Sequence, residues 1–386
     1  MMVKRVPIDT YCEKKIPTLQ KTYDGLIDYV DISSVDNAEK KIISYQTIDA
    51  NDAPSRAKQL LKQGDVLVST VRPNLNAVAV VEEETENLMV GSTGYCVLRC
   101  KETMDVRYLF NFCQSQYFVD DMSSQATGAS YPAVSNGIVR SSLIPCYSIE
   151  EQKDIAEKMD TVSELLALRK QQLAELDELT KARFVELFGD PISNPHGFDN
   201  VSLAELADIK IGPFGSLLHK EDYIEGGHAL VNPSHIISGK VVPDNKLTVS
   251  PEKYEELSAY HLKAGDVVMG RRGEMGRCAV VPCDGYLCGT GSLMIRTKGE
   301  VTADYIQKII SFPSFKKTIE DMAVGQTMPN LNVPIVSNFQ IIKPPIEVQQ
   351  SYYAFVEQTD KSKSAVQQSI AELEELKKSL MQKYFG

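Results

Sequence analysis

The chain has 386 residues, of which 43% are hydrophobic and 24% charged, and its formal net charge is −11. This composition is typical of a globular protein that is long enough to form two hydrophobic cores. The sequence has no apolar run of membrane length, and its polar amino terminus does not resemble a signal peptide, so we expect a cytoplasmic protein. The acidic balance argues against broad attraction to nucleic acid. DNA binding would need a local positive patch and a partner that helps to hold the phosphates.

The cysteines and histidines do not form a recognisable metal site or catalytic site. No Cys-x-x-Cys pair occurs among the eight cysteines. Cys278, Cys283 and Cys288 lie close together, but no histidine or fourth cysteine follows at a ligand spacing, so we expect reduced structural thiols rather than zinc. Walker-type phosphate loops and the Asn-Pro-Pro-Tyr string of amino-methyltransferases are also missing from the sequence. The sequence therefore predicts no catalytic residue, no metal and no cofactor bound by this chain.

The first candidate site is the loop of a predicted hairpin. Gly64 to Val68 has the pattern of a turn followed by a buried strand, and Ala77 to Val81 has the pattern of its partner strand. Arginine and asparagine side chains in the connecting loop are suited to bidentate contacts with guanine and adenine. Asparagine and proline also occupy hairpin loops for turn geometry alone, which is the structural alternative. The predicted DNA-binding residues of this loop are Thr70, Arg72, Asn74 and Asn76.

A second polar loop follows a predicted helix. Asp105 to Asp121 has the pattern of one amphipathic helix. The loop after it, Gln125 to Asn136, is rich in small hydroxyl and amide groups, and we predict DNA contacts from Ser130 and Tyr131.

Residues 150–188 are predicted to form one long helix with a heptad seam, because apolar residues recur at steps of four and three. Gly189 and Pro191 end it. An isolated helix with such a stripe needs a partner. The seam residues are predicted to be Met159, Val162, Leu166, Leu173 and Leu176.

Three loops after this helix contain further candidate residues. The glycines of Gly212 to Lys220 would let backbone N–H groups approach a phosphate, and here we predict contacts from Ser216, His219 and Lys220. A buried strand is predicted at Gly265 to Gly270, and the tip after it carries Arg271, Arg272 and Arg277 among glycines, which is the strongest nucleic-acid signal in the chain. Arginine clusters also bind carboxylates or lie in solvent. After a helix predicted at Asp304 to Met322, the loop to Asn332 supplies Gln326, Thr327 and Asn330.

The second half of the chain repeats the first. Ile149-Glu150-Glu151-Gln152 returns as Ile346-Glu347-Val348-Gln349, and AELDEL from Ala174 returns as AELEEL from Ala371, in each case 197 residues later. The Gly-Asp-Val of the first hairpin returns 201 residues later. Residues 347–386 therefore form a second long helix, with a seam predicted at Val356, Val366, Ile370, Leu373 and Leu380.

The order of the elements predicts an α+β protein with an internal pseudo-two-fold repeat. Two globular mixed α/β domains, residues 1–149 and 189–346, alternate with the long helices of residues 150–188 and 347–386. The first helix leads from one domain to the other, so the second can pack on it only by running back. The helices are thus predicted to form an antiparallel coiled coil.

These motifs together resemble the DNA specificity subunits of type I restriction-modification systems. The likeness rests on Ile341 to Gln350 leading into a heptad helix, on Gly325 to Asn332 before it, and on the duplicated order of domain and helix. The first copy departs from the pattern, because Ile144-Pro145-Cys146-Tyr147-Ser148 stands in place of the stretch with the Pro344-Pro345 pair.

The resemblance implies that each globular domain is a target recognition domain that reads half of a bipartite sequence in double-stranded DNA. The paired helices would act as a spacer and dock two modification subunits, which carry S-adenosylmethionine and methylate adenine. A restriction subunit with ATP-dependent translocation would join this core. An alternative of another class is a non-catalytic coiled-coil scaffold whose two heads bind proteins. A stand-alone enzyme would need chemistry that the sequence does not contain.

Overall fold

The computed structural model describes residues 3–213, 217–274, 276–323 and 330–386, and these residues form two compact units. The first unit consists of Met1–Leu173 with Ala365–Gly386, and the second of Ala174–Ser364. Each unit therefore contains a part of both long helices. None of the helices in the described ranges has the length and apolar character that a membrane span requires.

The two predicted long helices are confirmed as α4, Ile149–Phe188, and α10, Ile346–Phe385, each of 40 residues. Within the first unit, Lys170 of α4 lies 3.9 Å from Glu374 of α10. Within the second, Lys363 of α10 forms an ion pair with Asp177 at 2.7 Å. Farther along α4, the Thr180 carbonyl accepts a hydrogen bond of 3.4 Å from Tyr352, which lies earlier on α10. The helices thus run antiparallel, as predicted.

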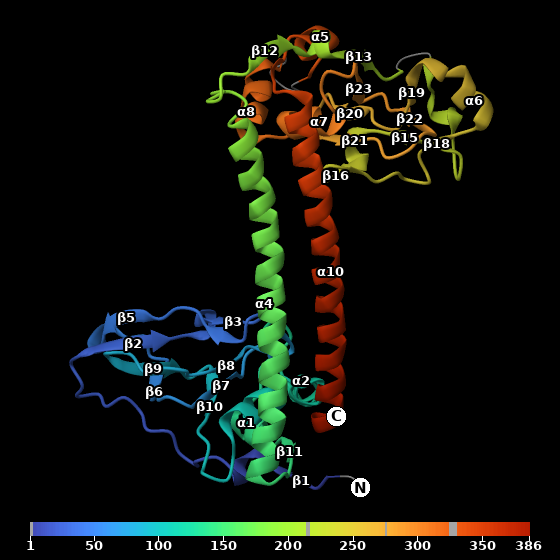
Figure 1. The fold of residues 1–386 in the computed structure, drawn as a ribbon. Helices are drawn as coiled ribbons and strands as arrows, with labels where there is room; N and C mark the ends of the chain where they lie inside the picture. Colours follow the sequence, from blue (N-terminus) through green and yellow to red (C-terminus); the bar gives the residue numbers. More distant parts are fainter. Residues whose placement is uncertain (1–2, 214–216, 275, 324–329) are drawn as a thin grey trace. The chain divides into compact units, whose positions relative to one another are not determined.

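The first unit contains two main sheets beside its parts of the long helices (Figure 1). One has the order β10-β7-β8 and the other the order β5-β2-β9-β6, and two short ladders, β1-β11 and β3-β4, complete the unit. The strands are β1 Arg5–Pro7, β2 Leu26–Val30, β3 Val35–Asp36, β4 Lys41–Ile42, β5 Gln46–Asp49, β6 Ala57–Leu60, β7 Val66–Ser69, β8 Val78–Val80, β9 Leu88–Ser92, β10 Tyr95–Leu98 and β11 Leu143–Pro145. The helices besides α4 and α10 are α1 Val106–Cys113, α2 Gln116–Gln125 and α3 Asn136–Ser141.

The second unit repeats this plan with a four-stranded sheet of order β13-β23-β20-β21 and a five-stranded sheet of order β14-β18-β15-β22-β19. Its short ladders are β12-β24 and β16-β17. The strands are β12 Asp199–Ser202, β13 Ala207–Ile211, β14 Tyr223–Ile224, β15 His228–Val231, β16 Ile236–Ile237, β17 Lys240–Val241, β18 Thr248–Val249, β19 His261–Leu262, β20 Val267–Gly270, β21 Cys278–Val280, β22 Tyr286–Cys288, β23 Ser292–Thr297 and β24 Gln340–Lys343. The helices are α5 Leu203–Leu206, α6 Pro251–Glu256, α7 Ala303–Ile310, α8 Pro313–Met322 and α9 Val333–Ser337.

The prediction of one continuous helix before each polar loop was wrong, because each is two short helices. In the first unit the chain breaks between α1 and α2, where the Ser115 hydroxyl accepts a hydrogen bond from the Phe118 N–H and caps α2. In the second unit Pro313 begins α8, because proline has no N–H to continue the ladder of α7. Both breaks fall within an unbroken apolar pattern, so periodicity alone did not show them.

The repeated Gly-Asp-Val string encodes the same buried ion pair in both units. Gly64 and Gly265 adopt left-handed backbone angles, with φ of 85° and 84°. The aspartate after each of them accepts a backbone N–H from three residues earlier and binds an arginine of the neighbouring strand. The pairs are Asp65 with Arg99 at 2.7 Å and Asp266 with Arg296 at 2.6 Å.

The repeated glutamine near the start of each long helix joins that helix to its unit. Gln152 is buried, accepts the Asp105 N–H at 2.9 Å and donates to the Tyr147 carbonyl at 3.0 Å. Gln349 is buried in the same way, accepting the Thr302 N–H and donating to the Pro344 carbonyl, each at 3.0 Å. These amides satisfy backbone groups that would otherwise be unpaired.

The end of each long helix closes a hydrophobic core. Phe385 at the end of α10 packs in the first unit, with its ring centroid 5.3 Å from that of Tyr108. Phe188 at the end of α4 packs in the second unit, 5.2 Å from the equivalent Tyr305. Each unit is therefore completed by the last turn of a long helix.

Candidate nucleic-acid interface

In both units the hairpin tip lies against the second polar loop. A backbone bridge joins Val71 to Ala133 in the first unit, and the equivalent bridge joins Arg272 to Asn330 in the second. The Arg72 N–H also donates to the Pro132 carbonyl at 2.7 Å. In each unit the structure thus brings together the hairpin tip and the polar loop, which the sequence analysis predicted as separate candidate sites.

The tip of the first unit has a fixed backbone. A short 3-10 helix, Pro73–Leu75, lies between two residues in the left-handed region, Arg72 and Asn76, each with φ of 49°. The Asn76 amide donates to the Cys113 carbonyl at the end of α1 at 2.8 Å. A left-handed conformation is uncommon for arginine, and the hydrogen bond of Asn76 to Cys113 stabilises this backbone shape of the tip.

Lys40 contacts the tip, and the sequence analysis did not predict this contact. Its ammonium group donates to the Asn76 side-chain oxygen at 2.9 Å and also to the Asn76 carbonyl. Burial, together with nearby Lys377, lowers the pKa of Lys40 to about 8. Asn76, predicted to contact DNA, is therefore engaged by the protein itself and positions the tip.

Four predicted residues of the first unit are exposed on the two loops: Arg72, Asn74, Ser130 and Tyr131. Tyr131 is 69% exposed, and the Arg72 guanidinium lies over its ring at 4.7 Å from the centroid. Thr70 is different, because it is buried and its hydroxyl donates to the Gly94 carbonyl at 2.9 Å.

Arg271 occupies the position of Thr70 in the second unit and is buried as well. Its N–H donates to the Gly291 carbonyl at 3.0 Å, as that of Thr70 does to Gly94. Its side chain donates to Asn330 at 3.0 Å, so both predicted residues join the two loops to each other. Burial and the neighbouring Arg272 lower the pKa of Arg271 below its ordinary value.

Arg277 is also engaged inside the protein. Its guanidinium donates to the Glu274 carboxylate at 2.6 Å and to the Pro233 carbonyl at 3.2 Å. Arg277 and Lys316, which both bind Glu274, lower the pKa of that carboxyl. A solvent-open cavity of about 440 Å³ lies beside this network, lined also by Ser238 and Gln307.

One predicted arginine of the second tip, Arg272, is exposed, and its side chain donates to the Asn330 side-chain oxygen at 3.5 Å. His219 and Lys220 are exposed at the start of another 3-10 helix, Lys220–Asp222. Leu218 before them packs in a different hydrophobic cluster from that of β20 and β21. Ser216, Gln326 and Thr327 lie outside the described residues.

The predicted seam residues of the long helices are all buried or half-buried. Met159 packs in the same cluster as Phe385, and Val356 packs against the cluster of Phe188. Met159, Val162, Leu166 and Val366 are buried, and Leu173, Leu176, Val356, Ile370, Leu373 and Leu380 are half-buried. Their individual effects on helix pairing remain predictions.

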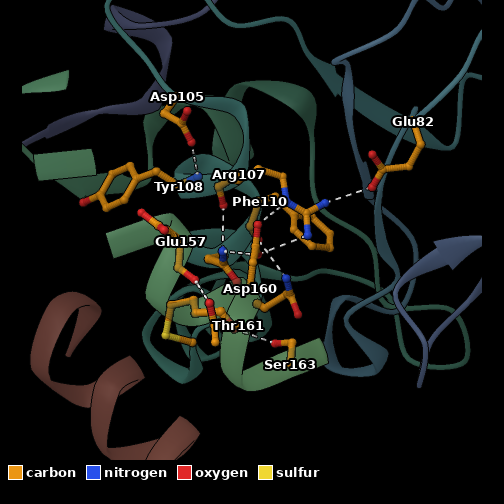
Figure 2. Close-up of polar contacts among 12 residues, drawn as sticks. Glu82, Asp105, Arg107, Tyr108, Phe110, Glu157, Asp160, Thr161 and Ser163 are labelled. Atoms are coloured by element: carbon orange, nitrogen blue, oxygen red, sulfur yellow. Dashed lines mark hydrogen bonds and ion pairs between the residues drawn. The ribbon is translucent and has the colours of Figure 1, made fainter. Parts of the chain in front are cut away.

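In the first unit an ionic network attaches α1 to α4 (Figure 2). Arg107 donates two hydrogen bonds to Asp160, at 2.7 and 3.1 Å, and a third to Glu82 at 2.9 Å. Asn111 also donates to Asp160, at 3.2 Å. Burial alone would lower the pKa of Arg107, but the two carboxylates outweigh it and raise that pKa. The network fixes α1 to the long helix, and α2, which comes next in the chain, leads into the Gln125 to Asn136 loop.

The thiols show no arrangement suited to a metal. All eight cysteines are unpaired, and burial raises the pKa of Cys278 and of Cys288 to about 12. Within the described ranges, no group of three or more histidine, cysteine, aspartate and glutamate side chains could hold a metal ion.

Comparison with known families agrees with the duplicated architecture. Residues 9–178 and 195–375 each match the type I restriction modification DNA specificity domain. The chain belongs to this family. The two matched ranges contain both hairpin tips and both polar loops, so the duplication seen in the structure is a duplication of the specificity domain.

Individual relatives of this specificity subunit are distant in sequence. The MjaVIII specificity subunit of a type I restriction enzyme from Methanocaldococcus jannaschii is 22% identical, over 67% of this chain and 65% of that subunit. A chain solved in a study of complex assembly and conformational transition of the type I R-M system is 25% identical, with a TM-score of 0.68 and coverage of 100% and 99% of the two chains. The HsdS subunit from Thermoanaerobacter tengcongensis is 24% identical, with a TM-score of 0.55 over 99% and 96%.

Proposed function

We propose that this chain reads a bipartite DNA sequence for a type I restriction-modification complex, with one half-site for each unit. The observation that supports this most strongly is the repeated pair of loops on a repeated frame. The bridge between the loops and the ion pair beneath them recur in both units. The loop residues differ, since TVRPNLN in one unit corresponds to RRGEMGR in the other. A constant frame with different loops is suited to reading two different half-sites.

The exposed polar groups suit base contacts. Arg72 and Asn74 of the first unit and Arg272 of the second are exposed at the tips. Arginine and asparagine form the bidentate contacts that distinguish guanine and adenine in the major groove. Since the chain is acidic overall, we infer that partner subunits supply much of the attraction to the phosphates.

Two modification subunits are the proposed partners, docked on the long helices. They would carry S-adenosylmethionine and methylate adenine, and a restriction subunit would use ATP, while this chain contributes recognition and no catalysis. In the first unit, Leu165 and Leu168 of α4 are 41% and 60% exposed, three residues apart on one side of the helix. Exposed leucines on a charged helix favour a protein partner.

The direct test is sequencing of methylated bases in host DNA, with the gene present and with the gene deleted. The proposal predicts that methyladenine at one asymmetric two-part motif disappears on deletion. Unchanged methylation in a host that expresses the modification subunits would contradict it.

A second experiment separates DNA recognition from the protein-binding scaffold. Arg272→Ala removes an exposed side chain and should reduce DNA binding by the assembled complex while leaving assembly intact. Leu168→Asp should reduce assembly without unfolding the chain, with the exposed Gln367→Asp as its matched control. If Arg272→Ala leaves DNA binding intact but impairs assembly, the scaffold function is favoured.

A further inference from the structure

We propose that Arg72 is the specificity-determining residue for one guanine in the half-site read by the first unit, and that Tyr131 holds it in the reading position. This inference rests on the proposed function and adds to it a named base and the two side chains that select it.

The donors of Arg72 are available to a ligand. The side chain is exposed, and the described residues provide no hydrogen-bond partner for its guanidinium. Two arginines of the second tip differ in this respect, because Arg277 is bound by Glu274 and Pro233, and Arg271 is buried against Asn330. The third, Arg272, is exposed and donates to Asn330 at 3.5 Å.

The aromatic contact fixes the orientation of Arg72 without using its donors. The guanidinium carbon lies 4.7 Å from the centroid of the Tyr131 ring. This cation–π contact leaves the N–H groups, which lie at the edge of the guanidinium plane, without a carbonyl or carboxylate acceptor among the described residues. The edge therefore remains free for a planar acceptor pair. O6 and N7 of guanine form such a pair in the major groove.

The backbone beneath Arg72 is equally fixed. Both ends of the tip adopt the left-handed conformation, and the Asn76 side chain is held by Lys40 and by the Cys113 carbonyl. The Arg72 N–H is bound to Pro132 in the loop that carries Tyr131. An arginine that is already placed before binding loses less conformational freedom when it contacts a base.

The composition of the two loops favours a base over a phosphate. Arg72 is the only charged residue in the loop sequences TVRPNLN and QATGASYPAVSN, and the ammonium group of Lys40, which lies against the first loop, is bound to Asn76. Leu75 beside it is 48% exposed, which adds an apolar surface to the tip. A phosphate contact generally forms part of a cluster of cations, whereas a single ordered arginine among neutral side chains suits the floor of the groove.

The test uses the complete complex with its modification subunits and measures methylation at each position of the target by sequencing. Arg72→Lys keeps the charge but loses the planar fork. We expect methylation to continue at the two-part motif, while discrimination for one guanine in one half-site falls by about 10- to 100-fold. Tyr131→Ala should relax the same position by a smaller factor, and Tyr131→Phe, which keeps the ring, should leave it unchanged.

Three results would overturn the inference. One is an equal loss of methylation at all sites with Arg72→Lys, which would indicate a phosphate contact. Another is relaxation at a base other than guanine, or no relaxation at all. The third is that the unaltered chain gives no methylation at a two-part motif. This result would refute the proposed function itself, and it is distinguished from the other two because it is seen before any residue is substituted. Assembly of each variant, measured by size-exclusion chromatography, controls for folding.

Discussion

The two units share their internal supports but differ at the surface that those supports carry. Asp65 and Asp266 bind equivalent arginines, and Gln152 and Gln349 bind equivalent backbone groups. At the tips, by contrast, the first unit has a single arginine, which lies over a tyrosine ring. The second unit has three arginines, of which one is buried, one forms an ion pair and one is exposed. The comparison teaches that the two units share the polar residues that hold their frames together, whereas their tips differ even at an equivalent buried position, where Thr70 corresponds to Arg271.

The largest expected effect comes from breaking the buried ion pair of the first unit. The Asp65 and Arg99 side chains are 0% and 9% exposed, so Arg99→Met leaves a carboxylate buried alone and should cost about 3–5 kcal/mol of the free energy of unfolding of that unit. Arg296 is 36% exposed, so Arg296→Met should cost the second unit less, about 1–2 kcal/mol, because water can reach Asp266.

Hydrogen exchange of peptides from each unit, measured against urea concentration, separates these two losses. Equal losses in the two units would contradict the role assigned to exposure.

Replacing the buried glutamines should show how similar the two frames are. Gln152→Leu and Gln349→Leu each leave a buried backbone N–H without its acceptor, and each should cost its own unit about 1–3 kcal/mol. The exposed Gln367→Leu is the control and should change stability little. A loss confined to one unit in thermal unfolding would show that the duplicated contacts are not equivalent.

The Arg107 network should produce a smaller loss in the first unit alone. Arg107 is 37% exposed, so Arg107→Met should cost about 1 kcal/mol. The equivalent residue, Asp304, is exposed and forms no side-chain ion pair among the described residues, so Asp304→Met should change stability by less than about 0.5 kcal/mol. Chemical denaturation of both variants tests the difference, and a similar loss in each would count against the network.

The last expected effect is a change of stability with pH that depends on Lys40. Its folded pKa of about 8 lies below the ordinary 10.5, so folding releases a proton between these values and stability should rise with pH across that window. Below pH 8 the ammonium is charged in both states, and the cost of its burial is fully present. Lys40→Met should remove this rise, measured as the difference from the unaltered chain in urea denaturation at several pH values between 7.5 and 10. A parallel rise in both proteins would assign it to other groups.

The fold could be predicted to a large extent because its main signals are periodic or repeated. The heptad seam indicates the long helices, and the 197-residue offset shows the duplication. Gly189 and Pro191 also indicated the end of the first long helix, but the sequence did not show that Phe188 and Phe385 fill the cores of different units. That packing depends on contacts between distant segments, which no local pattern records.

The sequence predicted which loops form the candidate site, but it did not predict the roles of individual residues in them. Composition identified both loops of each unit, and the structure places them side by side. The composition of the sequence did not distinguish the exposed Arg272 from the buried Arg271, because the direction of a loop side chain depends on the neighbouring loop. Lys40 gave no signal, since one lysine in a polar stretch has nothing to mark it until its contact with Asn76 is seen.

The central claim is that each unit reads its own half-site, and one measurement tests it most directly. Asn74→Ala in the first unit and Arg272→Ala in the second are introduced separately, and the methylated motif is determined by sequencing in cells that carry the modification subunits. We predict that each substitution relaxes bases in a different half of the motif and leaves the spacing between the halves unchanged. If both relax the same half, or if both only lower methylation uniformly, the account is contradicted.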